Sequence, residues 1–178
     1  MADSDFRAPH LRNQDFLGTF AWIERGEGDH REVLLVGNER RVHGKDVETW
    51  DLPGGQVEPG ELVVEALRRE LQEEISVDVG DGAPEFLFVQ DGERRDGDVR
   101  KHAWRSVFFA VQLPEGAEPK AGAEVRGLRW KKVADMPGRL VAPYHDSLKA
   151  WLEGGKSGTW VQSVWEEQPG TLAPAQDS

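Results

Sequence analysis

The sequence predicts one α/β domain in which helices cover a mixed β-sheet. Several short runs of β-branched and aromatic residues are separated by polar, glycine-containing turns, a pattern typical of strands. A long amphipathic helical run interrupts these strands, and a second run with helical spacing follows them. The chain has 178 residues, of which 38% are hydrophobic, so it is long enough for one well-packed domain and short for two.

The two ends of the chain predict little regular structure. We expect residues 1–14 to form a flexible tail, residues 15–155 to form the domain, and residues 156–178 to form a C-terminal extension with a mobile end. Trp160 and Trp165 lie in this extension, where they could close the fold or contact a second copy of the chain. The sequence does not decide between these two roles.

The first half of the domain predicts a hairpin and then a helix. Residues 16–24 and 32–36 are apolar runs joined by a glycine-rich, charged turn, so they predict two paired strands. Residues 37–48 are mostly polar and predict a loop. Residues 54–77 lead from a Gly-Gly turn into a strongly helical run. When this run is projected at about 100° per residue, its core-facing apolar stripe contains Val64, Leu67, Leu71 and Ile75.

The second half predicts three more strands and another helix. Residues 85–90 and 125–133 have strand composition, and residues 104–113 form the longest strand candidate. Because both faces of 104–113 are largely apolar, that strand should be interior to the sheet. The charged segment 91–102 predicts a loop. Residues 139–152 have apolar residues at helical spacing, end before two glycines, and should pack on the sheet.

Composition narrows the classes of partner. The formal charge of −11 argues against a general nucleic-acid-binding protein, because contacts to phosphates require clustered Lys and Arg. An anionic substrate would therefore need a cation as intermediary. The chain has no cysteine, no run of 18 apolar residues and no basic, apolar leader, so it predicts a cytoplasmic protein without a membrane segment.

Three acidic residues near the end of the first helix predict a cation site. Glu70, Glu73 and Glu74 fall in the helical sector that borders the apolar stripe. Each pair of like charges costs about 0.2–0.5 kcal/mol even on an exposed helix, and the helix dipole disfavours negative charge at this end. A divalent cation such as Mg²⁺ would offset both penalties. The alternative is a solvated acidic helix end, in which Arg69 pairs with Glu65 or Glu73.

The spacing of these residues resembles the Nudix box, G-x5-E-x7-R-E-U-x-E-E-x-G-U, in which U is a bulky aliphatic residue. The matching positions are Gly55, Glu61, Arg69, Glu70, Leu71, Glu73, Glu74 and Val77. The departure is Ser76, which stands where the family has Gly. The preceding WDLPGG and the later segment 124–137 also resemble the family. The resemblance implies an α/β/α sandwich with a mixed sheet, and hydrolysis of a nucleoside diphosphate linked to another group, with Mg²⁺ or Mn²⁺.

The resemblance also implies roles for individual residues. The metal-binding groups would be the carboxylates of Glu70, Glu73 and Glu74 and the backbone carbonyl of Gly54. Arg69 would orient Glu70, and Glu61 would hold the loop against the helix. Glu124 is a candidate further ligand or general base, although a plain surface role is equally compatible with its residue type. Ser76 would take a left-handed conformation at a cost of about 1 kcal/mol and supplies no carboxylate.

The substrate is less well defined by the sequence. A nucleoside triphosphate or related nucleotide is the expected substrate; the alternatives are ADP-ribose, a dinucleoside polyphosphate, a nucleotide sugar, coenzyme A, or a Nudix domain that binds nucleotide without turnover. The candidate substrate-binding residues are Arg40, Arg41, Lys45 and Trp50. We expect a small-molecule nucleotide partner, no nucleic acid, and a monomer or homodimer.

Overall fold

The computed structural model describes residues 16–42, 45–138, 145–154 and 160–166. Its helices are α1 (Val63–Ile75) and α2 (His145–Glu153), with short 3-10 turns at Gly28–His30 and Val133–Gly138. Its strands are β1 (Phe16–Trp22), β2 (Glu24–Arg25), β3 (Glu32–Val42), β4 (Lys45–Asp51), β5 (Gly54–Gln56), β6 (Glu85–Asp96), β7 (Val99–Ala110), β8 (Gly127–Lys132) and β9 (Trp160–Glu166).

The strands form two sheets. The first has the order β5-β1-β7-β6-β9 and is mixed, because β1 runs parallel to β7 and β6 runs parallel to β9, whereas the other two pairs are antiparallel. The second sheet contains β2, β3, β4 and β8, all paired antiparallel with β3 at its centre. β7 is interior to the first sheet, as the apolar run of residues 104–113 predicts.

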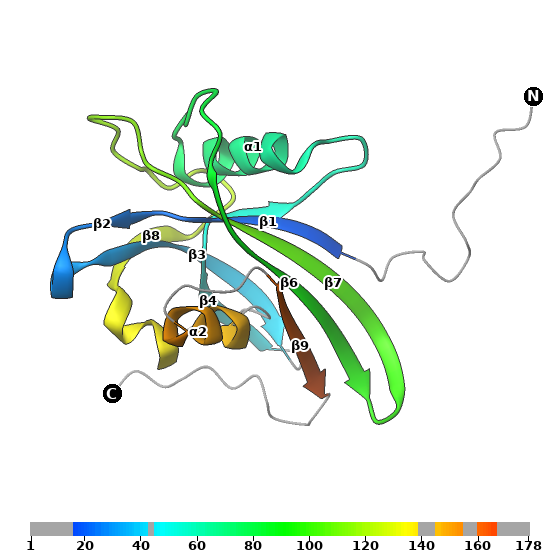
Figure 1. Cartoon of the computed structure of the whole chain (residues 1–178). Coiled ribbons are helices and arrows are strands. Elements are labelled where there is room, and N and C mark those ends of the chain that lie inside the picture. Colours follow the sequence, from blue (N-terminus) through cyan, green and yellow to red (C-terminus); the bar gives the residue numbers. More distant parts are fainter. Residues whose placement is uncertain (1–15, 43–44, 139–144, 155–159, 167–178) are drawn as a thin grey trace, which may run out of the picture.

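The two helices lie on opposite sides of the strands, with α1 above them and α2 below in Figure 1. One apolar cluster joins α1 to Ala21 of β1 and to Ile23, which follows that strand. The other cluster joins α2, through Leu148 and Trp151, to the opposite face of β1. This is the α/β/α sandwich that the sequence predicts. Of the predicted stripe residues of α1, Leu67, Leu71 and Ile75 are fully buried, and Val64 is partly buried.

The prediction of loops at 37–48 and 91–102 is wrong, because both segments lie almost entirely in strands. The first belongs to the β3–β4 hairpin and the second to the β6–β7 hairpin. Charged residues on both faces obscured the two-residue period of a strand. In the β6–β7 hairpin these charges are paired across the strands, Asp91 with Arg105 (3.4 Å), Asp96 with Lys101 (3.2 Å) and Glu93 with Arg100. Glu93 also pairs with Arg95 of its own strand (2.9 Å).

The predicted second helix and C-terminal extension are described in part. α2 begins at His145, and residues 139–144 of the predicted helix lie outside the described residues. The extension contributes β9, which pairs with β6 over Val89–Arg95. The predicted tail, 1–14, and the end of the extension, 167–178, are likewise outside the described part of the chain. Within the described part, neither helix has the length and apolar content needed to span a bilayer.

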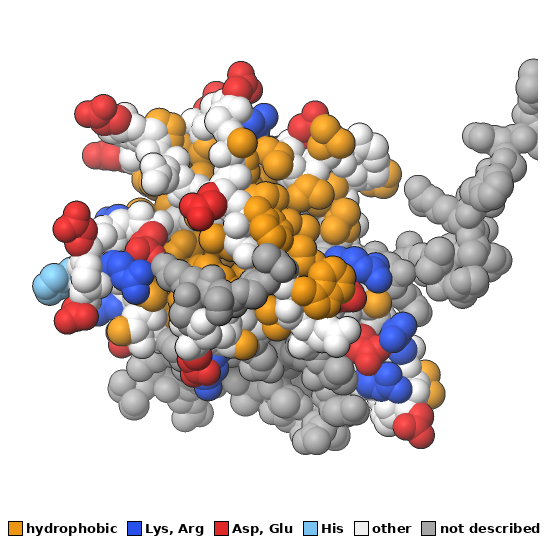
Figure 2. All heavy atoms as spheres, in the orientation of Figure 1, with side chains coloured by type: hydrophobic (Ala, Val, Ile, Leu, Met, Phe, Trp, Pro, Cys, Tyr) orange, Lys and Arg blue, Asp and Glu red, His pale blue; other side chains and the backbone are white. Residues whose placement is uncertain are grey.

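The face shown in Figure 2 carries hydrophobic side chains over its middle and charged side chains around its edge. Acidic and basic side chains are interspersed along that edge.

Candidate active site

Two glycines at the start of β5 allow this strand to lie directly against β1 and α1. Gly54 has φ of 136°, and a Cβ atom there would lie 2.1 Å from the Thr19 carbonyl oxygen. A Cβ atom on Gly55 would lie 2.5 Å from Oε1 of Glu70. The Gly54 N–H donates a hydrogen bond of 2.8 Å to Oε2 of Glu74. Gly54 is therefore required by its positive φ and by its close approach to the backbone of β1, and Gly55 by its close approach to the Glu70 carboxylate.

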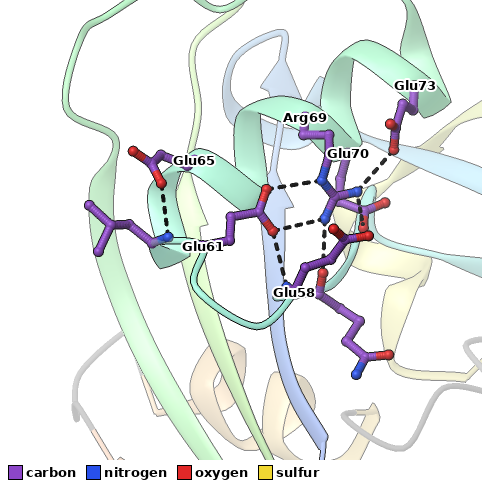
Figure 3. Close-up of polar contacts among 8 residues, drawn as sticks. Glu58, Glu61, Glu65, Arg69, Glu70 and Glu73 are labelled. Atoms are coloured by element: carbon purple, nitrogen blue, oxygen red, sulfur yellow. Dashed lines mark hydrogen bonds and ion pairs between the residues drawn. The ribbon is translucent and has the colours of Figure 1, made fainter. Parts of the chain in front are cut away.

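Arg69 connects this loop to the acidic residues (Figure 3). Its Nε and Nη2 donate to the two oxygens of Glu61 at 3.0 and 3.1 Å. Its Nη1 donates to Glu70 at 2.9 Å and to Glu73 at 3.0 Å, and Nη2 also donates to the Gln56 carbonyl at 3.0 Å. These bonds raise the pKa of Arg69, with Glu61 as the largest cause. The guanidinium thus holds three carboxylates and the loop backbone together.

Glu61 and Glu65 fasten the entry to the helix. The Glu58 N–H donates to Glu61 at 3.0 Å, and the hydrogen bond from Arg69 lowers the pKa of Glu61, so this carboxylate stays charged. The first residue before α1 is Leu62, which has no polar side chain to cap the helix. Glu65 compensates by accepting a 2.9 Å hydrogen bond from the Leu62 N–H. Acidic side chains therefore fix the start of the helix, where the positive end of the helix dipole stabilises their negative charge.

The end of α1 is held by the loop that precedes β8. Ser76 adopts φ of 57° and ψ of 34°, the left-handed conformation expected for the position where the family has Gly. The N–H groups of Lys120 and Gly122 donate to the last-turn carbonyls of Ile75 and Glu74, both at 2.9 Å. Glu124 follows Gly122 by two residues, so these bonds place it near the acidic side chains of the helix.

Burial and like charge dominate the electrostatics of this cluster. Glu70 and Glu74 are only 9% and 7% exposed, whereas the side chain of Glu73 is 41% exposed and bonded to Arg69. Burial is the main cause that raises the pKa of Glu70. Burial, followed by the charges of Glu70, Asp51 and Glu124, raises the pKa of Glu74 to about 8. At neutral pH, Glu74 therefore favours its protonated form unless a positive charge is nearby.

The donor set fits a hard divalent cation. All the side-chain groups around Glu74 that raise its pKa are carboxylates, and oxygen ligands of this kind suit Mg²⁺ and Mn²⁺. A cation beside them would remove both the mutual repulsion and the burial penalty. Across the described ranges, no three Asp, Glu or His side chains are already arranged closely enough to hold a metal ion. The metal-binding roles of Gly54, Glu70, Glu73 and Glu74 accordingly stay predictions.

The candidate substrate-binding residues lie on β3 and β4. Arg40 and Arg41 are on β3, and Lys45 begins β4, but the side chains of these three residues lie outside the described part of the structure. Trp50 packs over Gly37 and beneath the guanidinium of Arg129, which is 4.3 Å from the ring centre. It contacts the apolar cluster on the α2 side, the face opposite α1. Its predicted role in substrate binding stays a prediction.

Two features of the site escaped prediction from the sequence. Asp51 is 2% exposed and acts on the charge of Glu74, but its burial depends on partners from β3 that sequence spacing does not reveal. A Cβ atom on Gly122 would lie 1.6 Å from the Glu73 carbonyl oxygen, so this glycine permits the contact between loop and helix. The sequence signal that could have revealed Asp51 is its place in the WDLPGG segment, which resembles the family. Gly122 lies in no segment that resembles the family.

Comparison with known proteins agrees with this geometry. The family model described as "NUDIX domain" matches residues 16–152. A Bacillus subtilis (strain 168) protein named "Putative 8-oxo-dGTP diphosphatase" is 32% identical over 145 residues, which are 82% of this chain and 85% of the relative.

Two solved structures share the fold. The MutT protein from Bacillus halodurans aligns with a TM-score of 0.62 at 24% identity, covering 90% of this chain and 95% of that one. The NUDIX domain of Shewanella oneidensis NrtR, crystallised with ADP ribose, aligns with a TM-score of 0.61 at 20% identity, covering 88% and 100%. The family model and the Bacillus subtilis relative show that this chain belongs to the Nudix family, as a MutT-like hydrolase that acts on pyrophosphate bonds.

Proposed function

We propose that the protein hydrolyses a pyrophosphate bond of a nucleoside triphosphate or a related nucleotide and uses Mg²⁺ or Mn²⁺. The observation that carries this proposal is the pair of buried carboxylates, Glu70 and Glu74, which the Gly54–Gly55 turn and Arg69 hold in place. The name of the Bacillus subtilis relative supports a nucleoside triphosphate as the substrate. The alignment covers 85% of that relative, so the comparison applies to most of its length.

Each residue of the site has a distinct task in this proposal. Glu70, Glu73 and Glu74, with the Gly54 carbonyl, would hold the cation. When bound, a divalent cation neutralises charge on the pyrophosphate oxygens and makes water more acidic. Arg69 fixes the orientation of Glu70 through its 2.9 Å hydrogen bond. Glu70 or Glu124 would accept the proton of the attacking water as general base.

A panel of substrates tests the proposal. The purified protein is incubated with nucleoside di- and triphosphates, dinucleoside polyphosphates, ADP-ribose, a nucleotide sugar and coenzyme A, each with Mg²⁺ or Mn²⁺, and the products are identified. We expect fastest turnover of a triphosphate and no turnover in excess EDTA. Preferred cleavage of another compound in the panel would move the assignment to that substrate class. Tight nucleotide binding without turnover of any compound would instead indicate a non-catalytic Nudix domain.

A further inference from the structure

A buried hydroxyl group on β1, outside the Nudix box, lies close to the acidic residues of α1. Thr19 is 0% exposed, and no described residue forms a hydrogen bond with its Oγ1. Removing a hydroxyl from water costs free energy unless a donor or an acceptor replaces the lost solvent. The large majority of buried polar side-chain atoms have such a partner, so the Thr19 hydroxyl requires a physical reason for its position.

The alternation of β1 directs the Thr19 side chain to the α1 side of the sheet. Successive residues of a strand point to opposite faces. Phe20 belongs to the apolar cluster on the α2 side, whereas Ala21 belongs to the cluster that contains Leu71 of α1. Thr19 lies two residues before Ala21, so its hydroxyl points toward α1 as well.

The carboxylate of Glu70 lies beside this hydroxyl. Thr19 pairs with Gly55 in the antiparallel ladder of β1 and β5, so Cβ atoms at these two positions would lie about 5 Å apart on one face. A Cβ atom on Gly55 would lie only 2.5–2.8 Å from the carboxylate atoms of Glu70. Glu70 thus fills the space that a side chain opposite Thr19 would take. A change of rotamer at Thr19, or one bridging water, would join the two groups.

Glu70 can accept a further hydrogen bond. Among the described residues its one donor is Arg69, whose Nη1 lies 2.9 Å from Oε1. The same Nη1 also donates to Glu73 at 3.0 Å, so one nitrogen serves two carboxylates. An ionised carboxylate has about four acceptor positions. A donor on β1 would therefore restrict the orientation of Glu70 more than Arg69 does alone.

We propose that Thr19 is a positioning residue whose hydroxyl donates a hydrogen bond to the Glu70 carboxylate, directly or through one water, and so keeps Glu70 oriented for a divalent cation. Thr19 acts through Glu70. The consequence for cation binding rests on the proposed function, whereas the bond between Thr19 and Glu70 does not require it. The inference adds a residue of β1 to a site otherwise built from residues 54–62, α1 and residues 120–124.

The first test is a double-mutant cycle in the metal-free protein, measured by urea unfolding in EDTA. Thr19→Val keeps the shape of the side chain and removes the hydroxyl, and Glu70→Ala removes the carboxylate. If the two groups are bonded, Thr19→Val should reduce the folding equilibrium constant about 3- to 10-fold more in the parent than in Glu70→Ala. A hydroxyl without a partner predicts instead that Thr19→Val raises stability equally in both backgrounds. That result would overturn the inference.

The second test is Mn²⁺ binding by the full chain, measured without substrate from the electron paramagnetic resonance signal of free Mn²⁺. Thr19→Val should weaken Mn²⁺ affinity about 3- to 10-fold, the equivalent of one hydrogen bond, and Thr19→Ser should retain the parent affinity because it keeps the hydroxyl. The matched control is Ser147→Ala, which removes a 1%-exposed hydroxyl from α2 and should leave Mn²⁺ affinity unchanged. If Thr19→Val does not fold, Thr19→Ala takes its place in both tests.

The outcomes separate the inference from the proposed function. Coupling in the cycle, with no Mn²⁺ binding by the parent protein, would refute the cation site and leave the bond between Thr19 and Glu70 established. Normal Mn²⁺ binding by the parent, with unchanged affinity in Thr19→Val, would overturn the role of Thr19 alone. Equal weakening in Thr19→Val and Thr19→Ser would also overturn it, because the hydroxyl that Thr19→Ser keeps would then be without effect.

Discussion

At the scale of single residues, Glu74 shows how the fold places a carboxylate where its charge is unfavourable. Burial of its carboxyl group, followed by the charges of Glu70, Asp51 and Glu124, raises its pKa from 4.5 to about 8. The single compensating bond that acts on its pKa is the one from the Gly54 N–H. A purely structural helix gains nothing from this arrangement, whereas a nearby cation would offset its cost.

The raised pKa of Glu74 predicts how stability depends on pH in the metal-free protein. Between pH 4.5 and about 8, the folded state holds a proton that the unfolded chain has released, so the free energy of unfolding should fall as pH rises. Glu74→Gln cannot titrate and should show a flatter dependence. Urea unfolding across this pH range, in EDTA, measures the difference. Glu118→Gln, an exposed control, should keep the original slope; a Glu74→Gln slope equal to it would contradict the prediction.

Ser76 provides a second test at the residue scale. It is the single non-glycine residue with positive φ in the described part of the chain, at the position where the family has Gly. Ser76→Gly should raise the free energy of unfolding by about 1 kcal/mol, because Gly adopts the left-handed conformation without a steric penalty. Ser76→Ala keeps the Cβ atom and should bring no such gain. Chemical denaturation of the three proteins checks this; equal stability of Ser76→Gly and the parent would refute it.

At the scale of elements, the contact between α1 and the 120–124 loop brings Glu124 to the site. The contact depends on Gly122, because an added Cβ atom would lie 1.6 Å from the backbone oxygen of Glu73. Gly122→Ala should therefore force the loop away from the helix and lower the free energy of unfolding by about 1–3 kcal/mol. Gly82→Ala is the matched control, since a Cβ atom there meets nothing within 4 Å. Equal urea midpoints for the two variants would argue against this account.

The elements also show which parts of the fold a single sequence can predict. The periodic stripe of Leu67, Leu71 and Ile75 predicts α1 and its buried face, because the pattern is local. The strands that extend through 37–48 and 91–102 were missed because their charges are satisfied across the hairpin, as between Asp91 and Arg105. Strand pairing is a property of two segments, so neither segment alone reveals it.

The same distinction holds within the candidate site. The spacing from Gly55 to Glu74 lies in one stretch of chain, and the structure brings its Gly, Glu and Arg residues together. Asp51 became part of the site only through Asn38 on the neighbouring strand, and Glu124 only through backbone bonds from Lys120 and Gly122 to the helix end. Contacts between distant segments of this kind have no signature in residue spacing.

At the scale of the whole molecule, a chain of formal charge −11 belongs to a family that acts on negatively charged phosphates. The fold concentrates several of its acids, from β4, α1 and the loop before β8, around one helix end. Long-range repulsion would keep a nucleotide away from such a surface, and a divalent cation reverses that repulsion locally. The account therefore makes catalysis dependent on the cation and on the carboxylates that hold it.

The most direct test of this claim is the rate of Mg²⁺-dependent pyrophosphate hydrolysis by Glu73→Gln beside that of the parent protein. The Glu73 side chain is exposed, so its replacement should leave the fold intact. Loss of several kcal/mol of transition-state stabilisation corresponds to a rate at least about 100-fold lower. Glu118→Gln, an exposed substitution outside the helix, should retain most of the activity. A correctly folded Glu73→Gln protein that hydrolyses the substrate at the parent rate would contradict the assignment of the cation site.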